Sequence, residues 1–115
     1  HKKGACQKKN ITAIEQGISI GLKRILIRFA KHSEEQVGFS ETDEISMLTH
    51  VLPYLLPYGL DILIESWKTQ VIEYALKQGV KGFYDISGLQ DSGLIKLACE
   101  HQCSVIVPTS FTCLF

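Results

Sequence analysis

The spacing of the apolar residues in this chain changes from helical to strand-like four times, and this alternation restricts the fold more than any other feature of the sequence. Each stretch with helical spacing is followed by a short run rich in branched residues, which is typical of a buried strand. We expect these strands at residues 25–27, 60–64, 82–86 and 104–107. An αβαβαβαβ order with short connections predicts an α/β fold with right-handed crossovers and a parallel sheet of about four βα units.

Residues that start and stop helices bracket the expected helical segments. Side chains able to cap a helix stand before each one: Asn10, then Ser40 or Thr42, then Ser66, then Asp91 or Ser92. Pro57 with Gly59 predicts the end of the second helix, and Gly79 predicts the end of the third. Four such units form either a small open sheet or part of an eight-stranded (β/α)8 (TIM) barrel, and the pattern is consistent with both.

Length and charge limit the classes of function. At 115 residues and 12.9 kDa, the chain has the size of one domain. Its 12 Lys and Arg balance its 12 Asp and Glu, so binding to nucleic acid or an anionic membrane through bulk charge is not expected. We divide the chain into an unassigned segment at residues 1–9, an α/β domain at 10–110 and a tail at 111–115.

The cysteines and the first residues favour a reducing compartment. Cys6, Cys99, Cys103 and Cys113 form no C-x-x-C pair, so we expect three buried or half-buried thiols and one in the tail, with no metal site. The basic first residues are followed by polar ones instead of an apolar signal segment, and no stretch reaches the ~18 apolar residues of a membrane span. We therefore expect a cytoplasmic protein.

Polar and charged side chains follow every expected strand. In chain order they are Arg28, Lys31, His32 and Ser33, then Glu65, Ser66 and Trp67, then Tyr84, Asp85, Ser87 and Gly88, then Thr109 and Ser110. Parallel strands bring their carboxyl ends to one edge of the sheet, so these groups are expected to converge there. Such an edge can perform acid–base chemistry or hold a polar heterocycle.

Each candidate also has a structural explanation. The charge of Glu65 would favour the positive end of the helix that follows it. Asp85 suits an Asx turn as well as a ligand contact, His32 suits a solvated loop, and Trp67 suits packing. The sequence has no G-x-G-x-x-G, P-loop, H-E-x-x-H or G-x-S-x-G motif, so nothing indicates a nucleotide cradle, zinc-protease chemistry or a serine nucleophile.

A series of short motifs in the second half of the chain is more distinctive. Residues 64–68 read I-E-S-W-K, residues 75–79 read A-L-K-Q-G, and residues 85–89 read D-I-S-G-L. This series resembles the I-D-T-x-K, A-L-x-x-G and I-N-D-I-S-G motifs of the dihydropteroate synthase family. Upstream, residues 13–21 and His32-Ser33 are similar to the family's preceding helix and its G-E-S-T turn. Order and gap lengths agree over most of the chain, which would correspond to strands two to five of the family's eight.

The resemblance implies a pterin-binding TIM barrel, which in this family condenses a dihydropterin pyrophosphate with p-aminobenzoate in folate biosynthesis, a transferase reaction. It implies that Glu65 and Asp85 contact the pterin ring and that Ser33 assists near the leaving group. Loss of pyrophosphate leaves a cationic pterin that the amine attacks, so placement of charges is the expected catalytic device. No metal or cofactor is expected, and no catalytic residue is assigned.

The chain departs from the family pattern at several site positions. Glu65 stands where the I-D-T motif has aspartate, and Tyr84 stands where N-D has asparagine and so lacks the amide's paired donor and acceptor. Ser33 alone remains of the G-E-S-T turn. The family's first strand, and its later strands with a second pterin aspartate, a lysine and an arginine, have no counterpart in these 115 residues. We expect the chain alone to be inactive. The remainder of a larger chain, or pairing with itself or another chain, would complete the barrel; alternatively, the four units would re-form as a small open α/β domain.

Two further hypotheses remain open. A degenerate barrel segment that binds no ligand would act in assembly or interaction, which the missing site positions favour. A relative of the pterin-dependent methyltransferases would use a similar barrel with a corrinoid protein as its partner. Under the leading hypothesis the partner is a pterin-type small molecule, with neither nucleic acid nor a membrane involved.

Overall fold

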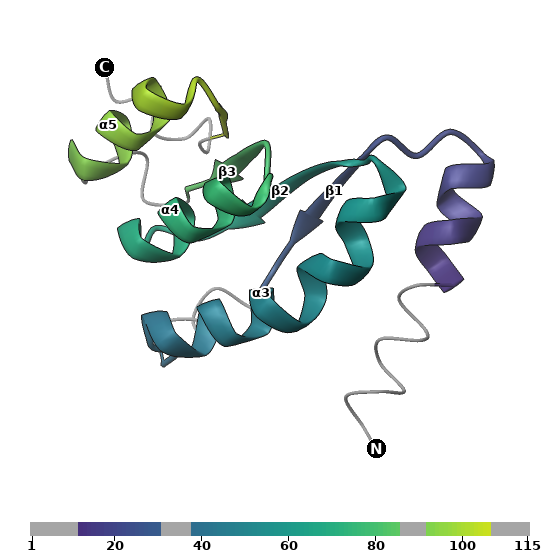
Figure 1. Ribbon diagram of the computed structural model, residues 1–115, viewed down its shortest axis with the longest axis horizontal. Helices are drawn as coiled ribbons and strands as arrows, with labels where there is room; N and C mark the ends of the chain where they lie inside the picture. The colour runs from purple at the N-terminus through teal and green to yellow at the C-terminus, as the bar shows by residue number, and fades with distance from the viewer. Residues whose placement is uncertain (1–11, 31–37, 86–91, 107–115) are drawn as a thin grey trace, which may run out of the picture.

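Helices and strands alternate in the predicted order. The computed structural model describes residues 12–30, 38–85 and 92–106. After a helix over residues 12–19, the elements are β1 (Arg24–Ile27), α3 (Glu41–Leu55), the 3-10 turn η1 (Leu56–Tyr58), β2 (Asp61–Glu65), α4 (Thr69–Gln78), β3 (Gly82–Tyr84), α5 (Ser92–His101) and β4 (Ser104–Ile106). Figure 1 shows the helix over 12–19 at the end of the molecule nearest β1.

The four described strands form one parallel sheet in the order β1-β2-β3-β4, so each strand pairs with the next along the chain. The register aligns Ile27 with Ile64, Ile64 with Phe83, and Phe83 with Val105. The predicted α/β fold with four βα units is confirmed.

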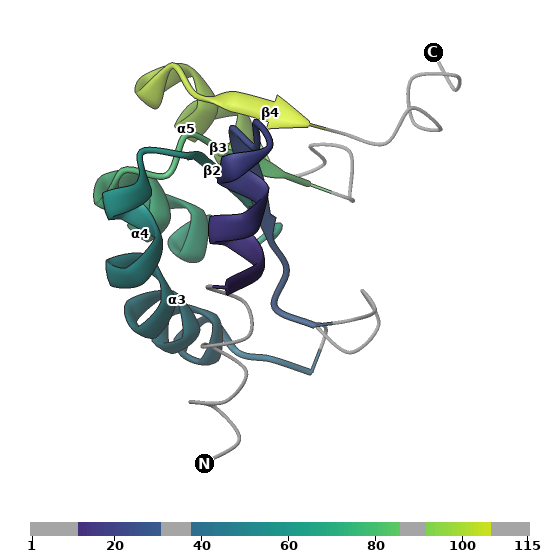
Figure 2. The same ribbon diagram turned by 90° about the vertical axis from the view of Figure 1, so that its right-hand side faces the viewer.

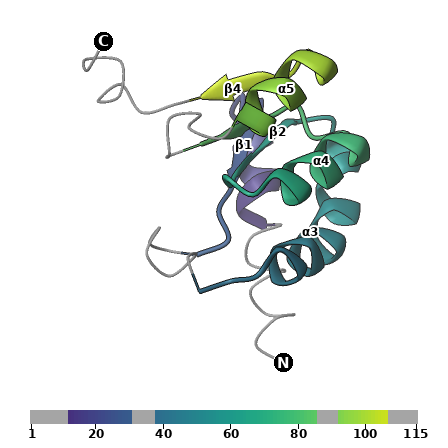
Figure 3. The ribbon, with the colours of Figure 1, turned by 90° about the vertical axis from the view of Figure 1, so that its left-hand side faces the viewer.

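The two faces of the sheet differ in what covers them. Helices α3, α4 and α5 lie on one side of the sheet (Figures 2 and 3). Ile64 and Phe83 point to this side and are fully buried among the apolar residues of the three helices. Because side chains alternate along a strand, Leu26 and Ile106 belong to the opposite face, where each is 42% exposed.

Helix α3 begins and ends where the sequence predicts. The Ser40 hydroxyl accepts from the Asp43 main-chain N–H at 3.1 Å, and the Asp43 carboxylate accepts from the Ser40 N–H at 2.8 Å. These bonds form a capping box, so Ser40 rather than Thr42 is the cap. The Ser40 main-chain bond also lowers the pKa of Asp43. At the other end, η1 follows the helix and Gly59 adopts the left-handed conformation with φ of 72°.

The expected start of the third helix is wrong. Helix α4 begins at Thr69, and its N-cap residue is Lys68, whose side chain makes no capping bond. Ser66 is not the cap because its hydroxyl is engaged elsewhere, as described below. Strand β2 also begins and ends one residue later than predicted, so Glu65 is the last residue of the strand. The predicted caps Asn10 and Asp91 lie outside the described residues.

Gly82 sets the close approach of β3 and β4. A Cβ at this position would collide with the main-chain oxygen of Ser104, so the first residue of β3 cannot carry a side chain without moving the neighbouring strand. Of the helices in the described ranges, none is long and apolar enough to cross a membrane.

Candidate functional site

The carboxyl ends of β2, β3 and β4 lie side by side. Glu65 is in register with Tyr84, and Tyr84 with Ile106. The hydrogen bonding continues one step past the strands, because Ser66 N–H donates to the Tyr84 carbonyl at 3.1 Å and Asp85 N–H donates to the Ile106 carbonyl at 2.9 Å. This continuous main-chain support fixes the positions from which side chains at this edge project.

Glu65 carries a buried carboxylate at this edge. Its side chain is 7% exposed, and its Oε2 accepts a hydrogen bond from Arg28 Nε at 3.3 Å. Arg28 directly follows β1, and its own side chain is 46% exposed. A half-exposed cation from one strand end thus offsets the charge of a buried carboxylate on the next.

A second buried carboxylate, on Glu44 in the first turn of α3, was not predicted as a site residue. Glu44 is fully buried. Its Oε1 accepts from the Ser66 hydroxyl at 2.9 Å, and its Oε2 forms an ion pair with Lys68 Nζ. We call Glu44, Ser66 and Lys68 the loop triad, because they tie α3 to the connection between β2 and α4.

The loop triad fixes the chain immediately after Glu65. The Lys68 main-chain N–H donates to the Ser66 hydroxyl at 3.2 Å, and Lys68 Nζ lies 4.5 Å from the centre of the Trp67 ring. Ser66 therefore holds the loop instead of capping α4. Trp67 is half-buried and packs against the core, as its structural explanation expects.

A sequence signal for Glu44 does exist. Glu44, Leu48 and Leu52 are spaced by four residues, so a carboxylate occupies the buried stripe of α3. A search of that stripe for apolar residues alone overlooks Glu44. A buried carboxylate is recognised when its position among apolar neighbours is considered.

Asp85 is fully buried and directly follows β3. Tyr84 is half-buried and shares the face of Glu65, because the two are in register. Alternation along β3 then directs Asp85 toward the helix-covered face, away from Glu65. Several candidates of the sequence analysis lie outside the described residues: Ser33, Lys31, His32, Ser87, Gly88, Thr109 and Ser110.

The remaining candidates lie away from this edge. His50 and His101 are exposed on helices, and His50 Nδ1 lies 2.8 Å from the Ser46 carbonyl. Cys99 is exposed, which corrects the expectation of a buried thiol, since it lies on the outer side of α5. Cys103 is half-buried, and burial raises the pKa of its thiol. Within the described ranges, no three His, Cys, Asp or Glu residues form a metal site.

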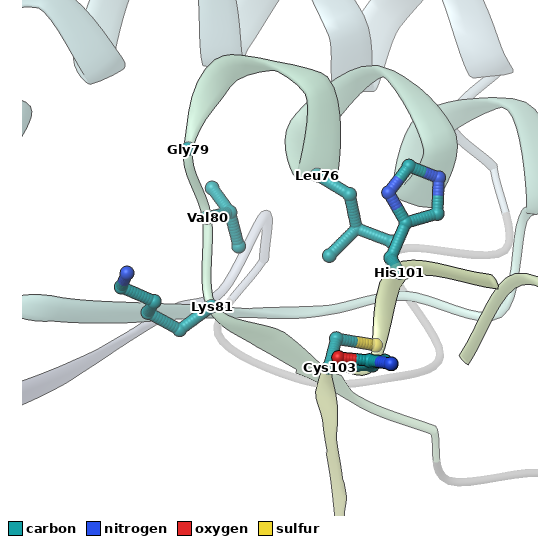
Figure 4. A pocket seen from close by; sticks show the side chains of 7 residues that line it. Leu76, Gly79, Val80, Lys81, His101 and Cys103 are labelled. Atoms are coloured by element: carbon teal, nitrogen blue, oxygen red, sulfur yellow. The ribbon is translucent and has the colours of Figure 1, made fainter. Parts of the chain in front are cut away.

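A shallow hollow of about 290 Å³ lies at the opposite edge, among the residues that precede β3 and β4. Figure 4 shows the side chains of Leu76, Lys81, His101 and Cys103 around it. In parallel α/β folds this amino edge serves stability, while ligands bind at the carboxyl edge. We therefore assign the candidate site to the carboxyl edge.

Comparison with known proteins decides the family. The sequence profile of the pterin binding enzymes matches residues 7–112. The chain belongs to the pterin binding enzyme family. The resemblance to dihydropteroate synthases in the sequence is thereby confirmed, although no curated protein matches the chain significantly.

Solved structures agree with this family on the fold. The crystal structure of dihydropteroate synthase from Thermus thermophilus in complex with 6HMPPP is 21% identical, with a TM-score of 0.63 over 85% of this chain and 37% of that one. Two further structures of dihydropteroate synthase from Thermus thermophilus, one of them in complex with 4-aminobenzoate, give TM-scores of 0.56 and 0.53 at 22% and 21% identity, over 73% of this chain and 40% of theirs. The chain thus spans 37–40% of the length of these pterin binding enzymes, and its four βα units match part of their TIM barrel.

Proposed function

We propose that this chain binds a pterin at the carboxyl edge of its sheet, and that Glu65 is the carboxylate that contacts the ring. The observation that carries the proposal is a buried carboxylate on the last residue of β2, at the edge where parallel α/β folds bind ligands. The aminopyrimidinone edge of a pterin presents a ring N–H beside an amino N–H, and one carboxylate accepts both. The family of pterin binding enzymes and the matched dihydropteroate synthase in complex with 6HMPPP support this ligand class.

Tyr84 is the neighbour that such a ring would meet on β3. It shares the face of Glu65, whereas the family motif implies a contact from Asp85. Comparing Asp85→Asn with Glu65→Gln separates the two possibilities. A ring contact from Asp85 predicts that both variants lose pterin binding, and the alternation of side chains predicts a much smaller loss for Asp85→Asn.

In a complete barrel, the proposed reaction is the condensation of a dihydropterin pyrophosphate with p-aminobenzoate in folate biosynthesis, in the cytoplasm. Ser33 would then assist near the departing pyrophosphate. The family's lysine, arginine and second pterin aspartate have no counterpart in this sequence. We therefore propose that the chain by itself binds pterin without turning it over.

Titration calorimetry of the 115-residue chain with pterin, up to millimolar concentration, tests the proposal. We expect binding heat with the unmodified chain and its loss in Glu65→Gln, because the amide offers one acceptor where the carboxylate offers two. Asp61→Asn is the matched control, since Asp61 lies on the same strand and face at the other end of β2. Absence of heat, or equal heats for all three proteins, would contradict a pterin site at Glu65.

A second candidate function is assembly through the face of the sheet opposite α3, α4 and α5. Leu26 and Ile106 are large apolar residues on that face, each 42% exposed, and exposed apolar surface favours association. Size-exclusion chromatography with light scattering distinguishes this role. If the chain acts as an assembly segment, the measured mass of the unmodified chain exceeds the 12.9 kDa of the monomer. Replacing Leu26 and Ile106 by serine is then expected to give a monomer of that mass.

A further inference from the structure

The contact between Arg28 and Glu65 has a chemical counterpart in the proposed ligand. The pterin edge that faces a carboxylate is a cyclic guanidine, with a ring nitrogen, the adjoining carbon and an amino group. An arginine side chain ends in the same N–C–N unit and presents N–H donors in the same plane. We propose that Arg28 is an internal competitor of the ligand, with its guanidinium occupying the hydrogen-bonding position on Glu65 that the pterin edge takes. This inference rests on the proposed function.

The geometry makes this contact replaceable. The N–H of Arg28 Nε reaches Glu65 Oε2 at a donor–acceptor distance of 3.3 Å. Charge-assisted N–H···O bonds in strong pairs measure about 2.7–2.9 Å and often come in parallel twos. A pterin edge that donates two parallel bonds therefore has a better match to the carboxylate than this long contact has.

The partners also differ in how firmly they are held. Glu65 is the last residue of a strand bonded on both sides, and the loop triad secures the residues that follow it. Arg28 lies beyond the end of β1, with a side chain that is 46% exposed against 7% for Glu65. An exchange of ligand for arginine thus requires that Arg28 swings into solvent, while the carboxylate stays in place.

The exchange has a consequence for affinity. Binding must replace an existing ion pair, so the pair lowers the affinity of every ligand that displaces Arg28 by the same factor. Selectivity comes from Glu65 itself. Lumazine has a carbonyl where pterin has the amino group, so it cannot offer two adjacent donors to the carboxylate and is disfavoured whether Arg28 is present or not.

Titration calorimetry with pterin and with lumazine tests the inference on the 115-residue chain. We expect Arg28→Gln to tighten pterin binding by about twofold to fivefold, the equivalent of one half-exposed ion pair. The affinity for lumazine is expected to rise by the same factor, so the ratio of pterin to lumazine affinity stays unchanged in this variant. Arg24→Gln is the matched control, because Arg24 lies on the same strand and face and pairs with Asp61 at the opposite edge. Its affinity for pterin is expected to remain unchanged.

The outcomes separate this inference from the proposed function. If neither the unmodified chain nor Arg28→Gln binds pterin, the proposed function fails and the competition fails with it. If both bind but Arg28→Gln binds equally or more weakly, the proposed function stands and the competition is wrong. Binding by Arg28→Gln alone supports the competition and contradicts pterin binding by the unmodified chain.

A second measurement avoids dependence on the stability of the variants. The ¹⁵N resonance of Arg28 Nε in the unmodified chain, assigned by its loss in Arg28→Gln, reports whether the guanidinium is paired. We expect pterin to move this resonance to the position of a solvated arginine, and the Arg24 resonance to stay fixed. A shift of Arg28 toward stronger hydrogen bonding would show that the arginine binds the ligand and would overturn the inference.

Discussion

Two arginines near the ends of β1 each pair with a carboxylate of β2 on the same face of the sheet. At the amino edge, Arg24 Nε lies 3.8 Å from Asp61 Oδ2, and the two side chains are 74% and 49% exposed. At the carboxyl edge, Arg28 Nε lies 3.3 Å from Glu65 Oε2, and the exposures are 46% and 7%. The residue types, strands and face are alike, so burial of the carboxylate is what distinguishes the edges.

The comparison shows how the carboxyl edge, where we propose that the ligand binds, differs from the amino edge. Water screens the exposed pair, which contributes little to stability. The buried pair places a carboxylate where little water competes for it, and a hydrogen bond to such an acceptor is stronger than one made in water. Charged residue types occur at both ends of the sheet, and the buried acceptor occurs at the carboxyl end.

The largest effect is expected from the loop triad, which lies beside the carboxyl edge. Glu44→Gln removes the buried carboxylate of the ion pair with Lys68, and we expect a loss of about 3 kcal/mol in the free energy of unfolding. Urea denaturation followed by circular dichroism measures it. The double variant Glu44→Met/Lys68→Met is expected to recover most of this loss, because it removes both charges. A double variant as unstable as the single one would contradict a buried ion pair.

The two arginine pairs can be compared directly with each other, and their expected effects on stability are smaller than that of the loop triad. Arg28→Gln is expected to lower the free energy of unfolding by about 1.5 kcal/mol, because it weakens a hydrogen bond to a buried charge. For Arg24→Gln we expect less than about 1 kcal/mol, since its pair is exposed to solvent. Equal losses in urea denaturation would mean that burial does not distinguish the two edges.

The first turn of α3 carries the exposed carboxylate of Asp43 next to the buried carboxylate of Glu44. The bond from the Ser40 N–H lowers the pKa of Asp43 below its ordinary value of 3.8. A lowered pKa in the folded state means that Asp43 stabilises the fold above pH 3.8 and loses this contribution as the pH falls through its folded-state pKa. We expect Asp43→Asn to be less stable than the unmodified chain near neutral pH and equally stable in strong acid. A stability difference independent of pH would exclude this charge effect.

The smallest effect concerns two thiols at the amino edge. Cys99 is exposed, whereas burial raises the pKa of the half-buried Cys103 and lowers its thiolate fraction. We expect iodoacetamide to label Cys99 several times faster than Cys103 in the folded chain and at similar rates in urea. Tandem mass spectrometry assigns the label to each cysteine. Labelling of Cys103 faster than Cys99 in the folded chain would contradict this prediction and would mean that the amino edge opens and exposes Cys103.

The sequence predicts the order of elements well because local signals act alone there. Strand periodicity, the Ser40 cap and Gly59 each act through neighbours in the chain. The prediction that Ser66 caps a helix is wrong because a partner distant in the sequence engages its side chain. Its hydroxyl bonds to Glu44, which lies 22 residues away in sequence, and no local pattern reveals that partner.

The candidate site can likewise be predicted only in part from the sequence. Parallel strands place Glu65, Tyr84 and Asp85 at one edge, which alternation of helices and strands already implies. Which of them share a face depends on the register of β2 against β3, and the register becomes visible only when strands are paired. The pairing of Arg28 with Glu65 depends in the same way on the register of β1.

The order β1-β2-β3-β4 has a consequence for how the chain is made. As the polypeptide leaves the ribosome, each new strand finds its partner already synthesised, because that partner is the strand just before it. Every pairing closes a loop of one helix and its connections, so no early strand waits for a distant one. The strand that carries Glu65 therefore has both of its neighbours in the sheet, β1 and β3, synthesised before β4.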